Sequence, residues 1–138
     1  MIGSYMIEFE IYFDGGSRGN PGHGYGSFAI LNNGEQVMLE QIDYAHLGNQ
    51  VTNNQAEYMT LIHALEKLVQ IRNGDLADTS VIVRGDSLLV INQILGKWKV
   101  KNEGLRPLHR RATELVNGFG KHQLIWHDRS NSVRVLGH

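Results

Sequence analysis

Hydrophobic and polar residues alternate along the first part of the chain with the two-residue period of a pleated strand. From residue 7 to residue 14, one set of side chains is apolar and the other is polar or charged. The apolar set is Ile7, Phe9, Ile11 and Phe13, and the other set is Glu8, Glu10, Tyr12 and Asp14. The pattern predicts a strand that packs one face on a core and carries a carboxylate, Asp14, at its end.

Two further strands are predicted at residues 25–31 and 36–42, which are bounded by turn-forming residues. The sequence Asn32-Asn33-Gly34 between them is a strong hairpin signal. The first three strands should therefore form an antiparallel meander, followed by a loop at residues 43–50.

The stretch between the first two predicted strands is unusually rich in glycine. Five glycines and one proline fall within residues 15–24. This density predicts the absence of regular structure and a backbone that can approach a ligand closely. An ordinary hairpin turn with a solvated Asp14 is the competing interpretation.

A long helix is predicted at residues 55–71, because Leu61, Ala64, Leu65 and Leu68 form an apolar stripe at helical spacing. The preceding residues 52–54, Thr-Asn-Asn, favour a helix cap. Glu57 is then expected in the first helical turn, where the helix dipole favours an ionised carboxylate.

The second half of the chain continues with shorter elements. Strands are predicted at residues 80–84 and 123–127, helices at 88–95, 107–118 and 130–136, and a polar, basic connection at 98–104. The order βββ-α-β-α-α-β-α predicts a mixed α/β (α+β) fold in which helices pack on one mixed sheet. With no repeat or linker in the sequence, residues 1–138 are expected to form a single domain.

The composition excludes several classes of protein and of binding site. The 138 residues carry a formal net charge of −1 and contain no cysteine. The lack of cysteine excludes disulfide frameworks and thiolate metal sites. Neither a signal peptide nor an apolar run of about 20 residues is present. We therefore expect a soluble, cytoplasmic protein without membrane contact.

One segment is locally basic in spite of the near-neutral total charge. Residues 97–111 contain one acid, Glu103, and six cations: Lys97, Lys99, Lys101, Arg106, Arg110 and Arg111. Such a cluster is either a solvated face or a footprint for nucleic-acid phosphates.

Three acids fall at the ends of predicted elements. Asp14 ends the first strand, Glu57 begins the long helix, and Asp86 follows the fourth strand. If the first and fourth strands are neighbours, these carboxylates meet at one edge of the sheet and require a cation to stay ionised. A hard ion such as Mg²⁺ or Mn²⁺, with a phosphate ester as substrate, fits this set. The alternatives are that Asp86 caps a helix and that Glu57 is half of a capping box.

Four sequence blocks resemble type 1 ribonuclease H. These are D-G-G-S-R-G-N-P-G from Asp14, T-N-N-Q-A-E from Thr52, G-D-S from Gly85, and W-K-V-K-N from Trp98, which resembles the substrate-facing segment of the compact branch without the basic handle. The resemblance implies the ribonuclease H-like fold, a five-stranded mixed sheet, and hydrolysis of the RNA strand of RNA–DNA hybrids. It also implies two divalent ions held by four acids, three of which fall on Asp14, Glu57 and Asp86.

The fourth acid is where the sequence departs from the family. Its expected position, about seven residues after Arg129, falls on Val135 and Leu136, which cannot bind a hard cation. Asn131 and the terminal His138 are the candidate replacements, with Asp128 less favoured.

The resemblance also implies contacts to each strand of a hybrid. The residues expected to bind the RNA strand are Gly15, Gly16, Ser17, Asn20, Asn53 and Gln55, and Ser87 is a further substrate residue. Those expected to bind the DNA strand are Trp98, Lys99, Lys101 and Asn102. Trp98 is equally well explained as packing, and His127 is expected to be structural, on the face of the last strand. No protein partner is implied, and we expect a monomer.

Three other functions remain open at this point. A missing fourth acid is compatible with a catalytically weak or inactive hybrid-binding module. A DNA-processing nuclease of the same superfamily, such as a resolvase or transposase core, is disfavoured by the compact length and the hybrid-type blocks. A small-molecule phosphate enzyme is disfavoured because the glycine-rich stretch matches neither a P-loop nor a dinucleotide-binding pattern.

Overall fold

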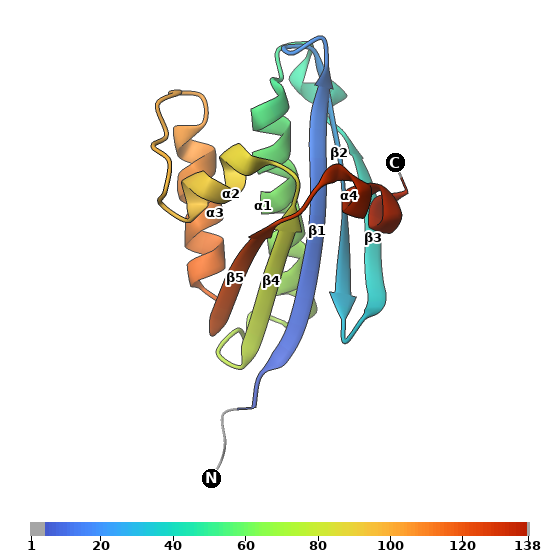
Figure 1. Cartoon of the computed structure of the whole chain (residues 1–138), viewed down its shortest axis with the longest axis vertical. Helices are drawn as coiled ribbons and strands as arrows, with labels where there is room; N and C mark the ends of the chain where they lie inside the picture. Colours follow the sequence, from blue (N-terminus) through green and yellow to red (C-terminus); the bar gives the residue numbers. More distant parts are fainter. Residues whose placement is uncertain (1–4, 138) are drawn as a thin grey trace.

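A five-stranded mixed sheet organises the protein (Figure 1), whose computed structural model describes residues 5–137. The strands are β1 (Ile7–Arg18), β2 (His23–Asn32), β3 (Glu35–Asp43), β4 (Thr79–Gly85) and β5 (Lys121–Trp126), in the spatial order β3-β2-β1-β4-β5. The β1–β2 and β2–β3 pairs are antiparallel, whereas β1–β4 and β4–β5 are parallel. The predicted meander and the adjacency of the first and fourth strands are confirmed.

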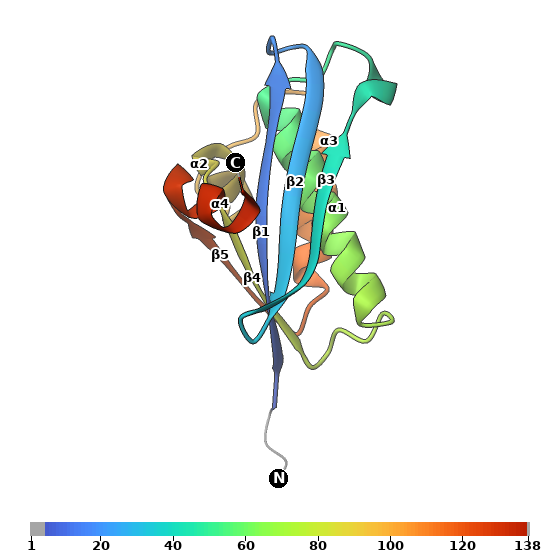
Figure 2. The ribbon, with the colours of Figure 1, turned by 90° about the vertical axis from the view of Figure 1, so that its right-hand side faces the viewer.

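Helices cover both faces of this sheet. They are α1 (Asn53–Ile71), α2 (Leu88–Ile94), α3 (Arg106–Asn117) and α4 (Arg129–Leu136), and a short 3₁₀ turn, η1 (Ala45–Leu47), precedes α1. Figure 2 shows α1 and α3 on one face of the sheet and α4 on the opposite face. Among the described residues, no helix is both long and apolar enough to cross a bilayer.

The main core lies between the sheet and α1. Phe9, Ile11 and Phe13 on one face of β1 pack with Leu61 and Leu65 of α1, as the alternating pattern predicts. Each such fully buried side chain contributes about 1.5–3 kcal/mol relative to an exposed one. A smaller cluster on the other face places Leu136 of α4 against Tyr12 and Ala29.

The glycine-rich stretch is more regular than its composition suggests, so the prediction of an irregular loop over residues 15–24 is wrong for most of its length. β1 continues to Arg18 and β2 begins at His23, and Gly15 pairs with Gly26 in the antiparallel ladder. Only residues 19–22 form the turn, with Gly19 at φ 110°. Glycine is used in the ladder itself because neighbouring groups approach the backbone too closely for a side chain.

The long helix begins two residues earlier than predicted. Thr52 is its cap: the Thr52 hydroxyl accepts from the Gln55 N–H, and the Gln55 side chain accepts from the Thr52 N–H. This capping box uses Gln55 rather than Glu57. Glu57 therefore lies beyond the first turn, and the expectation that it sits there is wrong. The other predicted elements agree with the structure to within about two residues at each end.

Candidate active site

The three predicted carboxylates meet at one edge of the sheet. Asp14, Glu57 and Asp86 each place a carboxylate oxygen within 4.8 Å of the other two. In the parallel β1–β4 ladder Phe13 pairs with Gly85, so Asp14 on β1 and Asp86 directly after β4 are the next residues along two adjacent strands. The register of the sheet therefore brings together two acids separated by 72 positions of sequence.

Glu57 joins them because α1 crosses β1 at a glycine. A Cβ atom at Gly15 would lie 2.6 Å from the carbonyl carbon and oxygen of Ala56, closer than packed atoms approach. The Gly15 N–H donates a hydrogen bond to the Glu57 carboxylate. Gly15 thus sets the distance between the helix and the strand that carry two of the acids.

The cluster is buried and electrostatically crowded. Asp14 is 5% exposed and Glu57 is 8% exposed. Burial, followed by the charges of Asp14 and Asp86, raises the pKa of Glu57 well above its usual value, and the Gly15 N–H offsets this only in part.

These groups fit a hard divalent cation. Oε2 of Glu57 is shielded from solvent and has no hydrogen-bond partner, and a buried acceptor of this kind is costly unless something pairs with it. Three carboxylates without nitrogen or sulfur ligands are the donor set that Mg²⁺ and Mn²⁺ prefer.

Asp86 is fixed by residues near the end of the chain that the sequence did not single out. The Trp126 indole N–H donates to the Asp86 carbonyl at 3.1 Å. The buried Ser132 hydroxyl of α4 lies 3.4 Å from Asp86 Oδ2 and 3.0 Å from His127 Nε2. The only sequence signal for Ser132 was that it is a small polar residue on the side of α4 that becomes buried.

His127 lies immediately after β5, not on the strand face where it was predicted. Its backbone N–H donates to the Gly85 carbonyl, and its ring stacks on Tyr12 with centroids 5.5 Å apart. Desolvation lowers the pKa of His127, and the nearby Asp86 charge opposes the shift. These contacts support the structural role that the sequence analysis assigned to it.

The candidates for the fourth ligand remain predictions. On α4, the Asn131 side chain donates to Asp128 and accepts from Arg134. Asp128 is exposed, and hydrogen bonding from the Ser130 hydroxyl lowers its pKa. His138 lies outside the described residues. Within residues 5–137, the acids that cluster closely enough to share an ion are Asp14, Glu57 and Asp86.

The glycine turn is tied to the start of α1 by predicted substrate residues. The Ser17 N–H donates to Asn53 Oδ1 at 2.7 Å, and the Asn53 N–H donates to Asn20 Oδ1 at 2.9 Å. The Ser17 hydroxyl is shielded and has no partner. Gly16 lies against the Tyr25 ring, and Ser87 caps α2 by accepting from the Val90 N–H. Asn53, Gln55 and Ser87 therefore have structural bonds in addition to any contact with a substrate.

The second predicted group lies in the irregular connection between α2 and α3. Trp98, Lys99, Lys101 and Asn102 are all exposed. A Cβ at Gly104 would lie 3.1 Å from Asn102 Oδ1 and 3.2 Å from Gln55 Nε2, so this connection reaches the first turn of α1. Gln55 of the first group and Asn102 of the second therefore both lie close to Gly104.

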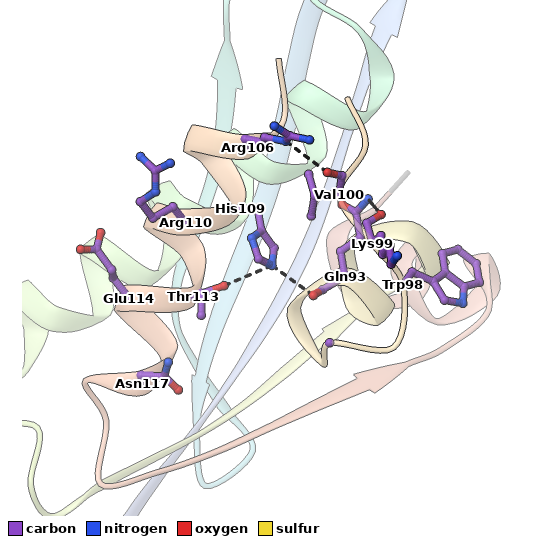
Figure 3. A pocket seen from close by; sticks show the side chains of 11 residues that line it. Gln93, Trp98, Lys99, Val100, Arg106, His109, Arg110, Thr113, Glu114 and Asn117 are labelled. Atoms are coloured by element: carbon purple, nitrogen blue, oxygen red, sulfur yellow. Dashed lines mark hydrogen bonds between the residues drawn. The ribbon is translucent and has the colours of Figure 1, made fainter. Parts of the chain in front are cut away.

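Four of the six clustered cations have no carboxylate partner. Arg106 pairs with Glu103 at 2.7 Å and Arg111 pairs with Glu66 at 3.1 Å. Lys97, Lys99, Lys101 and Arg110 form no ion pair within the described part of the chain. A groove of about 580 Å³ lies between this connection and α3 and is lined by Trp98, Lys99, Arg106 and Arg110 (Figure 3). This distribution favours the phosphate footprint over a face balanced by its own acids.

Comparison with known proteins gives consistent matches. The family described as reverse transcriptase-like matches residues 12–135. The ribonuclease HI of Halobacterium salinarum is 36% identical over 124 residues, which cover 90% of this chain and 58% of that protein. A bifunctional protein of Mycobacterium tuberculosis is 37% identical over 92% of this chain, which spans 33% of its length. The chain thus corresponds to only part of these two relatives.

Solved structures agree over almost the whole fold. The crystal structure of RNase H1 from Halobacterium salinarum has a TM-score of 0.81 and 33% identity, covering 94% of this chain and 93% of that one. A structure of LC11-RNase H1 in complex with an RNA/DNA hybrid also has a TM-score of 0.81, with 30% identity over 91% of this chain and 89% of that one. With the matched fold, the matched sequence and the carboxylate cluster together, the chain belongs to the type 1 ribonuclease H family, within the ribonuclease H-like superfamily.

Proposed function

We propose that this chain is a divalent-metal-dependent endoribonuclease that hydrolyses the RNA strand of RNA–DNA hybrids. The observation that carries the proposal is the convergence of Asp14, Glu57 and Asp86 within 4.8 Å at the edge of a ribonuclease H-like sheet. The hybrid bound to the similar LC11-RNase H1 supports the substrate class.

In this proposal Asp14 is the central ligand, because β1, which carries it, pairs with the strand that leads to Asp86 and packs against the helix that carries Glu57. Divalent ions held there would supply a nucleophilic water and neutralise the charge that develops on the scissile phosphate and the leaving 3′-oxygen. The ionised Glu57 would also accept a hydrogen bond from the adjacent ribose 2′-OH, a group that DNA lacks.

The residues around the acids would orient the two strands. Ser17, Asn20, Asn53 and Gln55 lie where the glycine turn meets the start of α1, and in this proposal they would contact the RNA strand. Lys99 and Lys101 would contact phosphates of the DNA strand without reading its sequence.

We further propose Mg²⁺ as the physiological ion, with Mn²⁺ as a substitute and two ions in each site. The all-oxygen donor set supports this assignment. Isothermal titration of the chain with each ion measures the preference and the stoichiometry. We also expect a single-domain, cytoplasmic monomer, which light scattering and cell fractionation test.

The decisive experiment incubates the purified chain with labelled RNA–DNA hybrid, duplex DNA and duplex RNA, each with Mg²⁺, Mn²⁺ or a chelator. Cleavage confined to the RNA strand of the hybrid and abolished by the chelator is the expected result. Cleavage of duplex DNA alone would instead indicate the DNA-processing class of the same superfamily.

A hybrid-binding module without turnover is the second candidate. It is favoured by one observation, the presence of only three clustered acids in residues 5–137. Tight binding of the hybrid without cleavage under any metal condition would establish it.

A further inference from the structure

A buried chain of hydrogen bonds connects α1 to the irregular connection between α2 and α3. Tyr58, the residue next to Glu57 on α1, is fully buried, and its hydroxyl donates to Gln93 Oε1 at 2.7 Å. Gln93 of α2 is 5% exposed, and its Nε2 donates to the backbone carbonyl of Lys99 at 3.2 Å. Two bonds thus lead from the helix that carries Glu57 to the backbone of Lys99.

All three helices of this region converge on Gln93. His109 of α3 lies 3.1 Å from the Gln93 carbonyl and 3.5 Å from the Thr113 hydroxyl, as the dashed lines in Figure 3 show. The His109 ring also meets the Tyr58 ring edge-on, with centroids 6.3 Å apart. The backbone and the side chain of Gln93 are therefore both fixed, so its side-chain amide is held in one position against the Lys99 carbonyl.

The connection that receives this bond has no regular secondary structure. Trp98, Lys99 and Lys101 have exposed side chains and belong to no helix or strand. The connection is held through its backbone: the Trp98 N–H donates to the Asn92 carbonyl, and the Arg106 side chain donates to the Val100 carbonyl at 3.3 Å. The bond from Gln93 links it, through Tyr58, to the part of α1 that carries Glu57.

We propose that Tyr58 and Gln93 are positioning residues that hold the Trp98–Asn102 connection in register with the carboxylate cluster. Lys99 and Lys101 then meet DNA-strand phosphates while the RNA strand lies at the acids. This inference rests on the proposed hybrid-cleaving function and assigns the spacing between the two strand contacts to one buried hydrogen-bond chain.

The test compares two substitutions with a matched control. Tyr58→Phe removes the first bond, and Gln93→Met removes both bonds at similar volume. Tyr44→Phe is the control, because it also removes a buried tyrosine hydroxyl bond. That bond joins Tyr44 Oη and Thr60 Oγ1 at 3.0 Å, far in sequence from the connection. The measurements are kcat and KM on a labelled hybrid, hybrid affinity in chelator, thermal midpoint, and deuterium exchange of the amides of residues 97–102.

We expect KM to rise about fivefold in Gln93→Met, and less in Tyr58→Phe, with kcat within about twofold of the parent. Exchange at residues 97–102 should accelerate in both variants but not in Tyr44→Phe. In a Lys99→Ala/Lys101→Ala background, Gln93→Met should cause no further loss of affinity, because it acts through those lysines.

An unchanged KM in Gln93→Met and Tyr58→Phe, with a parent that cleaves the hybrid, would overturn the inference. Unchanged exchange at residues 97–102 would do the same, even if both variants lose thermal stability as Tyr44→Phe does. Failure of the parent itself to bind or cleave any hybrid is a different outcome and counts against the proposed function.

Discussion

The catalytic edge and the α2–α3 connection solve different positioning problems in different ways. By the catalytic edge we mean Asp14, Glu57 and Asp86, which sit on or directly after regular elements and are mostly buried. The α2–α3 connection, residues 95–105, exposes its cationic side chains and is held by a few bonds to its backbone. One region fixes side chains, and the other fixes only the path of the chain.

The difference follows from what the proposed function requires of each region. Chemistry at a phosphate depends on placement to within about half an ångström, which only packed elements provide. Phosphate binding by lysine is electrostatic and tolerates mobile side chains. The rigid edge, however, accumulates repulsion between carboxylates, and the connection does not. Substitutions at the edge should therefore reduce kcat, and those in the connection should raise KM.

The largest effect is expected for Asp14→Asn. Removal of the central carboxylate should lower kcat by about a thousandfold or more, because the site loses its shared ligand. Hybrid affinity measured in chelator should stay equal or increase, since one negative charge is removed. The same variant without metal should unfold at a higher temperature than the parent, because the repulsion at the edge is reduced. A variant that still cleaves at the parent rate would remove Asp14 from the mechanism.

Gly15→Ala tests whether the edge depends on close packing of helix and strand. The added Cβ would meet the Ala56 backbone at 2.6 Å, so α1 must move away from β1. We expect a stability loss of about 1–3 kcal/mol by denaturant titration and a fall in kcat of about a hundredfold. Gly34→Ala is an informative control, because Gly34, at φ 82° with open space around it, reports backbone strain without displacement of α1.

The double variant Lys99→Ala/Lys101→Ala tests the connection. We expect KM to rise about tenfold with kcat nearly unchanged, since neither lysine reaches the acids in this proposal. The slope of log affinity against log salt concentration should become shallower by about 0.9 for each phosphate that the variant no longer neutralises. Lys67, an α1 lysine outside the cluster, provides the control. If Lys67→Ala raises KM and flattens the salt slope to the same extent per charge, total charge alone accounts for both effects.

Smaller effects are expected from the residues that support Asp86. Ser132→Ala removes the hydroxyl 3.4 Å from Asp86 Oδ2, and we expect kcat to fall about two- to fivefold with KM unchanged. Ser130→Ala, on the exposed side of α4, is the matched control. Equal kinetics for the two variants would limit the role of α4 to covering the sheet.

These regions also differ in how far the sequence predicts them. The alternation in residues 7–14 and the helical stripe of Leu61, Leu65 and Leu68 are local patterns, and the elements they predict are present. The meeting of Asp14 with Asp86 followed once the first and fourth strands were taken as neighbours. The extent of β1 was missed because glycine in a ladder has no strand pattern of its own: it is required by the approach of Ala56 and Tyr25.

Long-range hydrogen bonds were the least visible feature. Tyr58 and Gln93 lie 35 residues apart, and Asp86 and Ser132 lie 46 apart. Such contacts have no period or spacing rule, and Tyr58, Gln93 and Ser132 each look like ordinary positions on their own helices. They become apparent only when the sheet and the helices are assembled.

The smallest effect is expected at Asn131. Its side chain already bonds Asp128 and Arg134 within α4, so a role as fourth ligand would require these bonds to be exchanged for an ion. If the three clustered acids suffice, Asn131→Ala should change kcat less than twofold and leave the Mg²⁺ dependence of cleavage unaltered. If instead the variant needs markedly more Mg²⁺ for half-maximal rate while Asp128→Asn does not, Asn131 completes the site. Asn131→Asp discriminates further, because an added carboxylate tightens metal binding only where it can reach the ion.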